Sequence, residues 1–302
     1  MKQEQVGEAY NQYLRRLRKS VCMKKVTVKD FREMKGSGYA ISMLTAYDAS
    51  MARLLDQAGV AALLVGDSLG MVVLGYGSTV PVTMEEMLHH AGAVSRGTER
   101  ALVIGDMPFG SYQVSVEQAI TNGIRFLKEA GCDCVKLEGG EEVCDAVRGL
   151  VRAGVPVMGH IGLTPQTAGQ LGGFKVQGKD SHAARKLLAD AKALEKAGVF
   201  GIVLEAVPAL LAEIITETVV VPTIGIGAGA GCDGQVLVTN DMLGLFEKFT
   251  PKFVKQYCNL APDIKEGVQA FIREIQDGSF PAEEHSFAAK EDFSDLLGSE
   301  QK

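Results

Sequence analysis

A phrase that recurs along the chain constrains its fold more than any other feature. Each copy joins the end of an amphipathic helix to an Ala-Gly pair and then to a short apolar run. Four copies are clear: "LLDQAGVAALLVGD" (54–67), "FLKEAGCDCVKLEGG" (126–140), "LVRAGVPVMGHIG" (150–162) and "ALEKAGVFGIVLEAV" (193–207). The glycines stand where a helix commonly ends on a left-handed residue. The apolar runs are too continuous for half-exposed strands, so they indicate parallel strands covered on both faces.

Apolar runs of this kind predict eight strands. We expect them within residues 39–47, 61–66, 101–107, 133–139, 156–162, 201–207, 222–228 and 235–241. Helical periodicity separates most of them. Eight strand–helix units over about 250 residues match the size of a (β/α)8 barrel, and a doubly wound parallel sheet is the alternative.

The chain shows no Pro- or Ser-rich linker between Lys24 and Asp277. We therefore expect one catalytic domain over residues 24–281. Residues 1–23 would form an N-terminal extension or helix, and the acidic stretch 282–302 would form a flexible tail.

Composition limits the partners of the chain. Its net charge of −6 over 302 residues argues against nucleic acid as a main partner, because a phosphate-binding surface needs a basic excess. No apolar run is long enough to span a membrane, and the N-terminus has no apolar signal core. Six cysteines without a CxxC pair are typical of reduced thiols, so we expect a cytoplasmic protein.

Polar side chains end five successive predicted strands. They are Asp67 and Ser68, then Asp106, then Lys136 and Glu138, then His160, then Glu205. Each has a plainer interpretation by itself, such as a helix cap, a turn residue or a surface charge. In a barrel, however, the carboxyl ends of the strands meet at one mouth, where active sites lie. Gathered there, the carboxylates would repel one another unless a cation balanced them.

A hard divalent cation suits these side chains. Mg²⁺ takes oxygen ligands and often only one or two carboxylates, so Asp67 and Asp106 are the predicted pair, with Glu138 close by, directly or through a water. The Cys and His sets of structural zinc are absent. Glu205 lies in the apolar context "GIVLEAVP", which favours a general base. The residues thus suggest Mg²⁺-assisted proton abstraction beside the carbonyl of a 2-oxo acid, through an enolate.

A glycine-rich stretch, "GAGCDG" (229–234), matches the dinucleotide pattern G-x-G-x-x-G. That pattern should follow the first strand and open a helix. Here it comes late and precedes the β-prone "QVLV". We therefore interpret it as a loop whose backbone approaches a neighbour closely.

Several long stretches resemble the ketopantoate hydroxymethyltransferase family. They include "VGDSLGMVVLGYGSTVPVTMEEM", "DMPFGSY", "VKLEGG", "PVMGHIGLTPQ", "LEAVP" and "GIGAGAGCDGQVLV", in family order within residues 43–238. The resemblance implies a (β/α)8 TIM barrel of the phosphoenolpyruvate/pyruvate group. It also implies transfer of a hydroxymethyl group from 5,10-methylenetetrahydrofolate to 3-methyl-2-oxobutanoate. The product would be 2-dehydropantoate, on the route to pantothenate and coenzyme A.

The same resemblance assigns roles to individual residues. Metal contacts fall on Asp67 and Asp106, with Glu138 as the associated acid. Substrate contacts fall on Asp67, Ser68, Asp106 and Lys136, the pocket histidine on His160, and the proton acceptor on Glu205. The resemblance further implies Mg²⁺ as cofactor, small-molecule substrates, and a large homo-oligomer, a decamer.

Two other functions remain open at this point. A carbon–carbon lyase or mutase of the same barrel group would also use Mg²⁺ and enolates, but such lyases carry a "KKCGH"-like loop that this chain lacks. A non-catalytic barrel, retained as a binding or scaffold protein, is the second. A scaffold gains nothing from repelling carboxylates, which argues against it.

Overall fold

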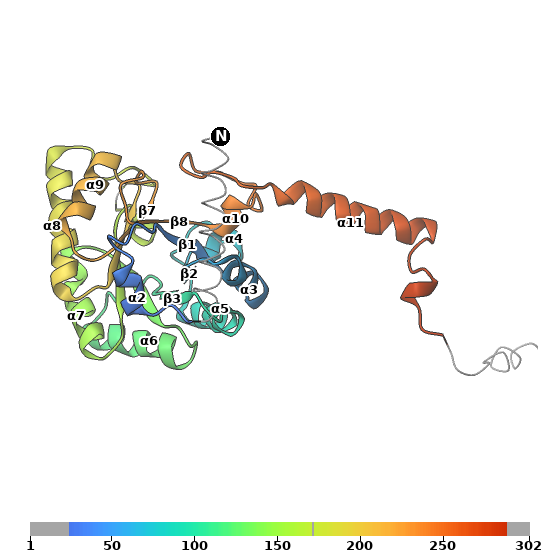
Figure 1. Ribbon diagram of the computed structural model, residues 1–302, viewed down its shortest axis with the longest axis horizontal. Helices are drawn as coiled ribbons and strands as arrows, with labels where there is room; N and C mark the ends of the chain where they lie inside the picture. The colour runs from blue at the N-terminus through green and yellow to red at the C-terminus, as the bar shows by residue number, and fades with distance from the viewer. Residues whose placement is uncertain (1–23, 171, 289–302) are drawn as a thin grey trace, which may run out of the picture.

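Parallel strands close into a barrel in the computed structural model, which describes residues 24–170 and 172–288 (Figure 1). In the described chain the strands are β1 (Ile41–Thr45), β2 (Ala62–Val65), β3 (Leu102–Asp106), β4 (Cys134–Glu138), β5 (Val157–Gly162), β6 (Gly201–Glu205), β7 (Thr223–Ile226) and β8 (Gly234–Leu237). Each pairs in parallel with the next, and β8 pairs with β1. The (β/α)8 prediction is confirmed, and the doubly wound sheet is wrong, since an open sheet does not pair its first and last strands.

Several helices lie around the outside of the barrel (Figure 1). The helices of the described residues are α2 (Val28–Glu33), α3 (Ala49–Ala58), α4 (Leu69–Val72), α5 (Met84–Gly97), α6 (Val116–Lys128), α7 (Cys144–Arg152), α8 (Ser181–Ala197), α9 (Ala209–Thr218), α10 (Thr239–Met242) and α11 (Leu260–Asp277), with single turns at Glu141–Val143, Pro165–Thr167 and Glu283–His285. Gly59 and Gly198 end α3 and α8 with φ of 95° and 105°, the left-handed ends that the Ala-Gly phrase predicts.

The eighth strand departs most from its predicted range. The eighth strand ends at Leu237 rather than running to residue 241, and Thr239 begins α10 instead. Thr239 anchors this turn to β1, because its N–H donates to Thr45 Oγ1 over 3.0 Å. The "GAGCDG" stretch is the loop that joins β7 to β8, as expected, and opens no helix.

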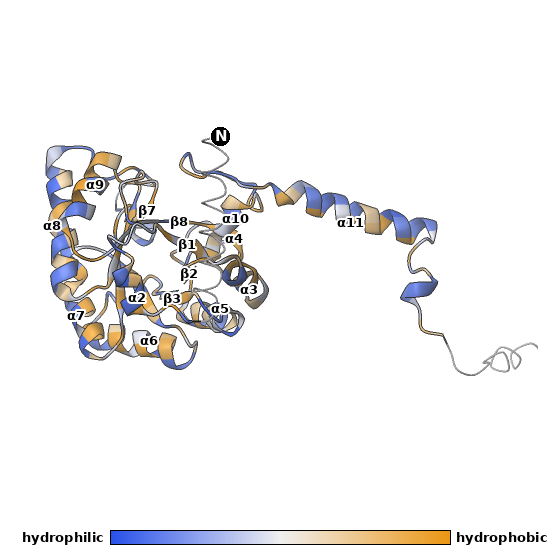
Figure 2. Cartoon of the chain, in the orientation of Figure 1, coloured by the Kyte–Doolittle hydropathy of each residue, from blue (hydrophilic) through white to orange (hydrophobic). Residues whose placement is uncertain are grey.

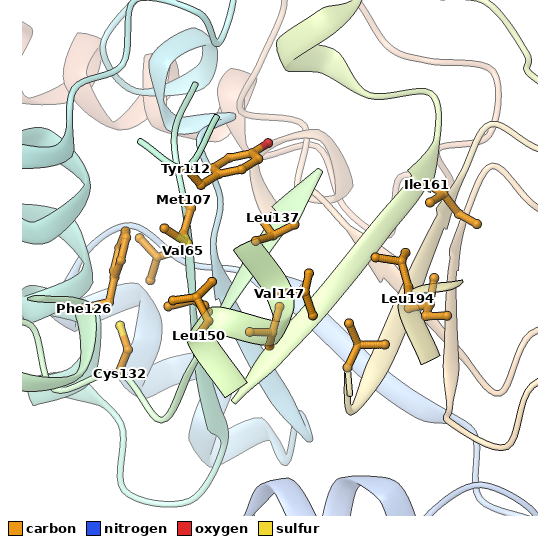
Figure 3. Close-up of a cluster of buried hydrophobic side chains, with 14 of the residues drawn as sticks. Val65, Met107, Tyr112, Phe126, Cys132, Leu137, Val147, Leu150, Ile161 and Leu194 are labelled. Carbon is orange, nitrogen blue, oxygen red and sulfur yellow. The ribbon is translucent and has the colours of Figure 1, made fainter. Parts of the chain in front are cut away.

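Two apolar clusters stabilise the barrel. The larger one lies between the strands and the helices and includes Phe126, Leu150 and Leu194 (Figure 3). Leu194 packs closely on β5, because a Cβ at Gly159 would lie 2.9 Å from Leu194 Cδ1. Gly105 on β3 allows the close approach of Phe126, because a Cβ there would lie 2.4 Å from Phe126 Cδ1. The smaller cluster fills the barrel interior, and Phe31 of α2 belongs to it. Burial of such side chains contributes about 1.5–3 kcal/mol each.

Helix α11 extends away from the barrel (Figure 1). Of its residues only Ala261 is buried. Its apolar side chains Ile264, Val268, Phe271, Ile272 and Ile275 are 46–54% exposed, and they recur at the spacing of one helical face. Figure 2 shows apolar residues among the polar ones along this projecting helix.

None of the helices in the described residues is both long and apolar enough to cross a membrane. The predicted extension at residues 1–23 and the tail from residue 289 onward lie outside the described residues. The boundaries of the predicted catalytic domain remain a prediction.

Candidate active site

The predicted polar side chains of β3, β4, β5 and β6 continue the inward-facing rows of these strands. On β3, Leu102 and Ile104 belong to the interior cluster, and Asp106 is the next residue of that row. Because side chains alternate along a strand, residues two apart share a face. The same spacing leads from Met158 to His160 and from Val203 to Glu205. A row that is apolar deep in the barrel therefore becomes polar at the mouth.

All seven predicted site residues line one cavity of about 550 Å³ at this mouth. They are Asp67, Ser68, Asp106, Lys136, Glu138, His160 and Glu205. Strand register brings several of them side by side, since Asp106 pairs with Lys136 between β3 and β4, and Glu138 pairs with His160 between β4 and β5. The prediction that these residues converge is therefore confirmed, while their individual roles stay predictions.

Asp67 and Asp106 form a buried acidic pair. The Asp67 N–H donates to Asp106 Oδ2 over 3.2 Å, and the two residues are 4% and 2% exposed. Burial raises the pKa of Asp67 well above its usual value, and the charges of Asp106 and Glu138 raise it further. Burial also raises the pKa of Asp106, although Lys136 opposes that shift. Ionisation of these two buried acids costs free energy, and a bound cation would offset that cost.

Lys136 is the buried cationic residue of the cluster. Its Nζ lies 2.7 Å from Asp106 Oδ1 and 3.8 Å from Glu138 Oε1. Burial disfavours its charge, but Asp106, Glu138 and Asp67 outweigh burial and raise the pKa of Lys136 above its usual value. Burial likewise opposes ionisation of Glu138, but the contacts to His160 and Lys136 lower the pKa of Glu138 overall. Lys136 is therefore held as a cation among carboxylates.

His160 connects this cluster to Glu205. Its Nδ1 lies 3.2 Å from Lys136 Nζ and 3.5 Å from Glu138 Oε1, and its Nε2 lies 3.2 Å from Glu205 Oε2. Burial and the Lys136 charge lower the pKa of His160, but the two carboxylates outweigh them and raise it to about 9.

The backbone fixes Glu205 at the end of β6. The Leu163 N–H donates to Glu205 O over 2.8 Å, and a Cβ at Gly162 would lie 2.2 Å from the same oxygen. Ala206, the next residue, has φ of 48°, the one positive φ of a non-glycine residue in the described chain. That conformation costs about 1 kcal/mol for alanine. The Glu205 side chain is 16% exposed, against 3% for Glu138, so more of it is accessible from the cavity.

Gln166 is a site residue to which sequence reasoning assigned no role. It is 3% exposed, and its Nε2 donates to Asp67 Oδ2 and to Met107 O, each over 2.9 Å. Its N–H donates to Glu138 Oε2 over 3.0 Å, and its Oε1 accepts from Tyr112 O–H over 2.7 Å. Gln166 thus joins Asp67 to Glu138. The available signal in the sequence was the motif "PVMGHIGLTPQ", which ends at Gln166.

Two further residues of the mouth were also missed. The hydroxyl of Tyr47, which is 5% exposed, lies 2.9 Å from Ser68 Oγ. Asp241, placed by sequence at the end of a strand, lies on α10 and lines the cavity.

The acidic pair is suited to Mg²⁺. The cavity is lined by five carboxyl groups, three lysines and one histidine. Three of the carboxylates, those of Asp67, Asp106 and Glu138, gather around the single buried lysine Lys136. Asp106 Oδ1 is buried and makes no hydrogen bond, despite its contact with Lys136. Among residues 24–170 and 172–288, no group of three or more His, Cys, Asp or Glu is arranged to hold a metal ion. Mg²⁺ in proteins commonly takes one or two carboxylate ligands, and water and substrate fill its other coordination positions. A pair of carboxylates such as Asp67 and Asp106 meets that requirement.

Comparison with known proteins identifies related chains. The model of the family described as ketopantoate hydroxymethyltransferase matches residues 25–283. The 3-methyl-2-oxobutanoate hydroxymethyltransferase of Desulfotalea psychrophila is 64% identical over 276 residues, which cover 91% of this chain and 99% of that protein. The protein of the same name from Syntrophus aciditrophicus is 60% identical over 264 residues, covering 87% and 97% of the two chains.

Solved structures share the fold at low identity. A phosphoenolpyruvate phosphomutase from Streptomyces platensis matches with a TM-score of 0.57 and 16% identity over 87% of this chain and 92% of that one. A 2,3-dimethylmalate lyase, described as a member of the PEP mutase/isocitrate lyase superfamily, matches with a TM-score of 0.54 and 15% identity over 89% and 92%. These structures support the barrel architecture alone.

Proposed function

Since the chain belongs to the ketopantoate hydroxymethyltransferase family, we propose that its barrel mouth transfers a hydroxymethyl group to 3-methyl-2-oxobutanoate. The one-carbon unit would come from 5,10-methylenetetrahydrofolate, and the product would be 2-dehydropantoate, used for pantothenate. One observation carries the assignment to this site: an acidic pair, a buried lysine and a separate carboxylate, Glu205, all line one cavity.

The cationic and hydroxyl groups would bind the 2-oxo acid. Lys136 supplies positive charge and Ser68 a hydroxyl, and both would contact the anionic substrate. Asp67 and Asp106 would hold a Mg²⁺ ion, whose charge would stabilise the negative charge that develops on the keto oxygen. Gln166 and Tyr112 would keep Asp67 and Glu138 oriented during the reaction.

Glu205 would act as the base. It would take the proton from C3 of the substrate, and His160 would steady the carboxyl group from Nε2. Water would add to the methylene carbon of the donor and break its bonds to the folate nitrogens, which releases tetrahydrofolate and leaves the carbon at the formaldehyde level. The electron pair at C3 would then form the new carbon–carbon bond to that carbon, and its oxygen would take up a proton to become the hydroxyl group. Holding both reactants in one cavity replaces a bimolecular encounter.

Family membership favours this reaction over the lyase, mutase and scaffold alternatives. The relatives named as hydroxymethyltransferases are 60–64% identical, whereas the mutase and lyase structures are 15–16% identical. The direct test follows 2-dehydropantoate by chromatography after mixing the protein with 3-methyl-2-oxobutanoate, Mg²⁺ and the methylene donor. We expect product only with both substrates present, and no product under any metal condition would refute the assignment.

We also propose that the chain is a homo-oligomer. The apolar face of α11 is exposed on one chain, and water-exposed apolar surface of this extent usually marks an interface. A second copy supplies a partner for it, in keeping with the decamer that the family resemblance implies.

A cytoplasmic location is the last part of the proposal. The described cysteines Cys132, Cys134, Cys144, Cys232 and Cys258 are all free, as expected of thiols in a reducing compartment.

A further inference from the structure

Asp241 is a buried acid of the mouth that the proposed reaction does not use. It is 9% exposed and lines the same cavity as Asp67 and Glu205. Within the described residues, no hydrogen bond or ion pair reaches its carboxylate. Buried carboxylates are normally paired, so an unpaired one that faces a cavity calls for a donor from a ligand.

The position of Asp241 is fixed by its neighbours. Two residues earlier, Thr239 is held to β1 by two hydrogen bonds. Its N–H donates to Thr45 Oγ1 over 3.0 Å, and its hydroxyl donates to Thr45 O over 2.5 Å. The Asp241 N–H donates to Val238 O over 3.1 Å. Burial raises the pKa of Asp241 to about 6, so the group is ionised at neutral pH and can only accept hydrogen bonds.

Aromatic side chains line the cavity along with Asp241. Phe246, Phe249 and Phe253 come from the segment after α10, and Phe174 comes from the β5–α8 connection. Phe174 and Phe249 are 61% and 67% exposed, which is costly for aromatic rings without a partner. Gly227 admits Phe253 to the mouth, because a Cβ there would lie 2.7 Å from Phe253 Cδ1.

A flat ring with adjacent N–H donors on one edge fits these features. Aromatic walls stack on such a ring, and a carboxylate accepts two parallel hydrogen bonds from its edge. The pteridine ring of a reduced folate has this chemistry, since an amide N–H and an exocyclic amino group lie side by side on it. Adenine has no ring amide N–H beside its amino group, and a 2-oxo acid has no N–H that could donate a hydrogen bond to a carboxylate.

We propose that Asp241 and the phenylalanines around it form the subsite for the pteridine ring of the one-carbon donor. The inference rests on the proposed function and adds the place where the second substrate binds. Because the subsite and Glu205 share one cavity, the donor and the 2-oxo acid occupy it together.

Binding of tetrahydrofolate tests the subsite apart from the chemistry. We expect Asp241→Ala to raise the Kd for tetrahydrofolate, measured by calorimetry on the full-length protein, at least about tenfold, because both charge-assisted bonds are lost. The KM for the methylene donor should rise in parallel. Deuterium exchange at C3 of 3-methyl-2-oxobutanoate, measured without any folate on the original protein, reports separately on the 2-oxo acid half of the reaction.

Two further variants keep the test decisive. Phe249→Ala changes an exposed side chain that the fold does not require, and we expect it to weaken tetrahydrofolate as well. Glu247→Gln is the matched control, an exposed acid of the same segment whose partner is Lys265, and it should leave the Kd unchanged. A tetrahydrofolate Kd that is unchanged in both Asp241→Ala and Phe249→Ala would overturn the proposal. Failure of the proposed function itself would instead appear as absent exchange and absent product in the original protein.

Discussion

Gln166 Nε2 donates to Asp67 Oδ2 over 2.9 Å, and both side chains are buried. The bond occupies one oxygen of a carboxylate proposed to bind Mg²⁺. The amide cannot rotate freely, because its oxygen accepts from Tyr112 O–H and its nitrogen also donates to Met107 O. Gln166 therefore orients Asp67 without itself facing the reaction.

Replacement of Gln166 by leucine should weaken Mg²⁺ binding. The variant leaves Asp67 Oδ2 buried without a donor, which disfavours the ionised acid and costs about 1–3 kcal/mol. We expect the Kd for Mg²⁺, measured by calorimetry, to rise roughly tenfold in a protein that still folds. Gln113→Leu is the control, because Gln113 contacts Gln166 but not Asp67. An unchanged Mg²⁺ affinity in Gln166→Leu would contradict this role.

Loss of the Lys136 charge should destabilise the barrel. Lys136→Met removes the partner of Asp106 and leaves an unpaired acid in a buried site, which typically costs about 3–5 kcal/mol. Urea unfolding without metal measures the change. The double variant Lys136→Met with Asp106→Asn should recover part of the loss, since the carboxylate at position 106 that lacked its partner is then removed. A single variant as stable as the original protein would show that the pair contributes nothing.

The buried acid Asp241 should make stability depend on pH. Its folded pKa of about 6 lies above the ordinary value of 3.8, so the fold favours the protonated form. Its contribution is favourable at low pH and is lost as pH rises from about 4 to 6. Asp241→Asn should therefore be more stable than the original protein at pH 8, by about 1–3 kcal/mol, with little difference near pH 4. Lower stability of the Asn variant at pH 8 would contradict the account.

Disruption of the apolar face of α11 should reduce the assembly. Val268→Glu with Ile272→Glu places two charges on the exposed stripe of the helix. Light scattering after gel filtration should give a smaller mass than the original protein, while the melting temperature of the barrel changes little. Gln269→Glu, on the polar side, should leave the mass unchanged. An unaltered mass in the double variant would place the interface elsewhere.

Removal of the proposed base should separate binding from chemistry. Glu205→Gln keeps the shape of the side chain but cannot accept the C3 proton. We expect calorimetry to show Mg²⁺ and 3-methyl-2-oxobutanoate binding within a few-fold of the original protein, and turnover to fall by about 10²–10⁴. Loss of substrate binding in this variant would assign Glu205 to binding rather than to proton transfer.

The barrel and the convergence of its site could be predicted because both follow from local patterns. Continuous apolar runs mark buried parallel strands, and residues two apart on one strand share a face, which carries Asp106 to the mouth. The eighth strand was overextended because "VTND" contains β-prone residues, whereas Thr239 is drawn into a turn by its bonds to Thr45.

Other features depend on contacts between segments distant in the chain. Gln166 reaches Asp67 across 99 positions, and no spacing rule connects them. The direction of α11 was equally hidden, because its amphipathic pattern predicts an apolar partner without saying which surface supplies it.

Proton exchange at C3 of 3-methyl-2-oxobutanoate reports on proton removal by Glu205 without any contribution from the folate. The protein is mixed with this substrate in D₂O, with and without Mg²⁺ and without folate, and the C3 proton signal is followed by NMR. We expect Mg²⁺-dependent loss of the signal, which Glu205→Gln slows at least a hundredfold. Exchange that persists at the original rate in Glu205→Gln would contradict the account.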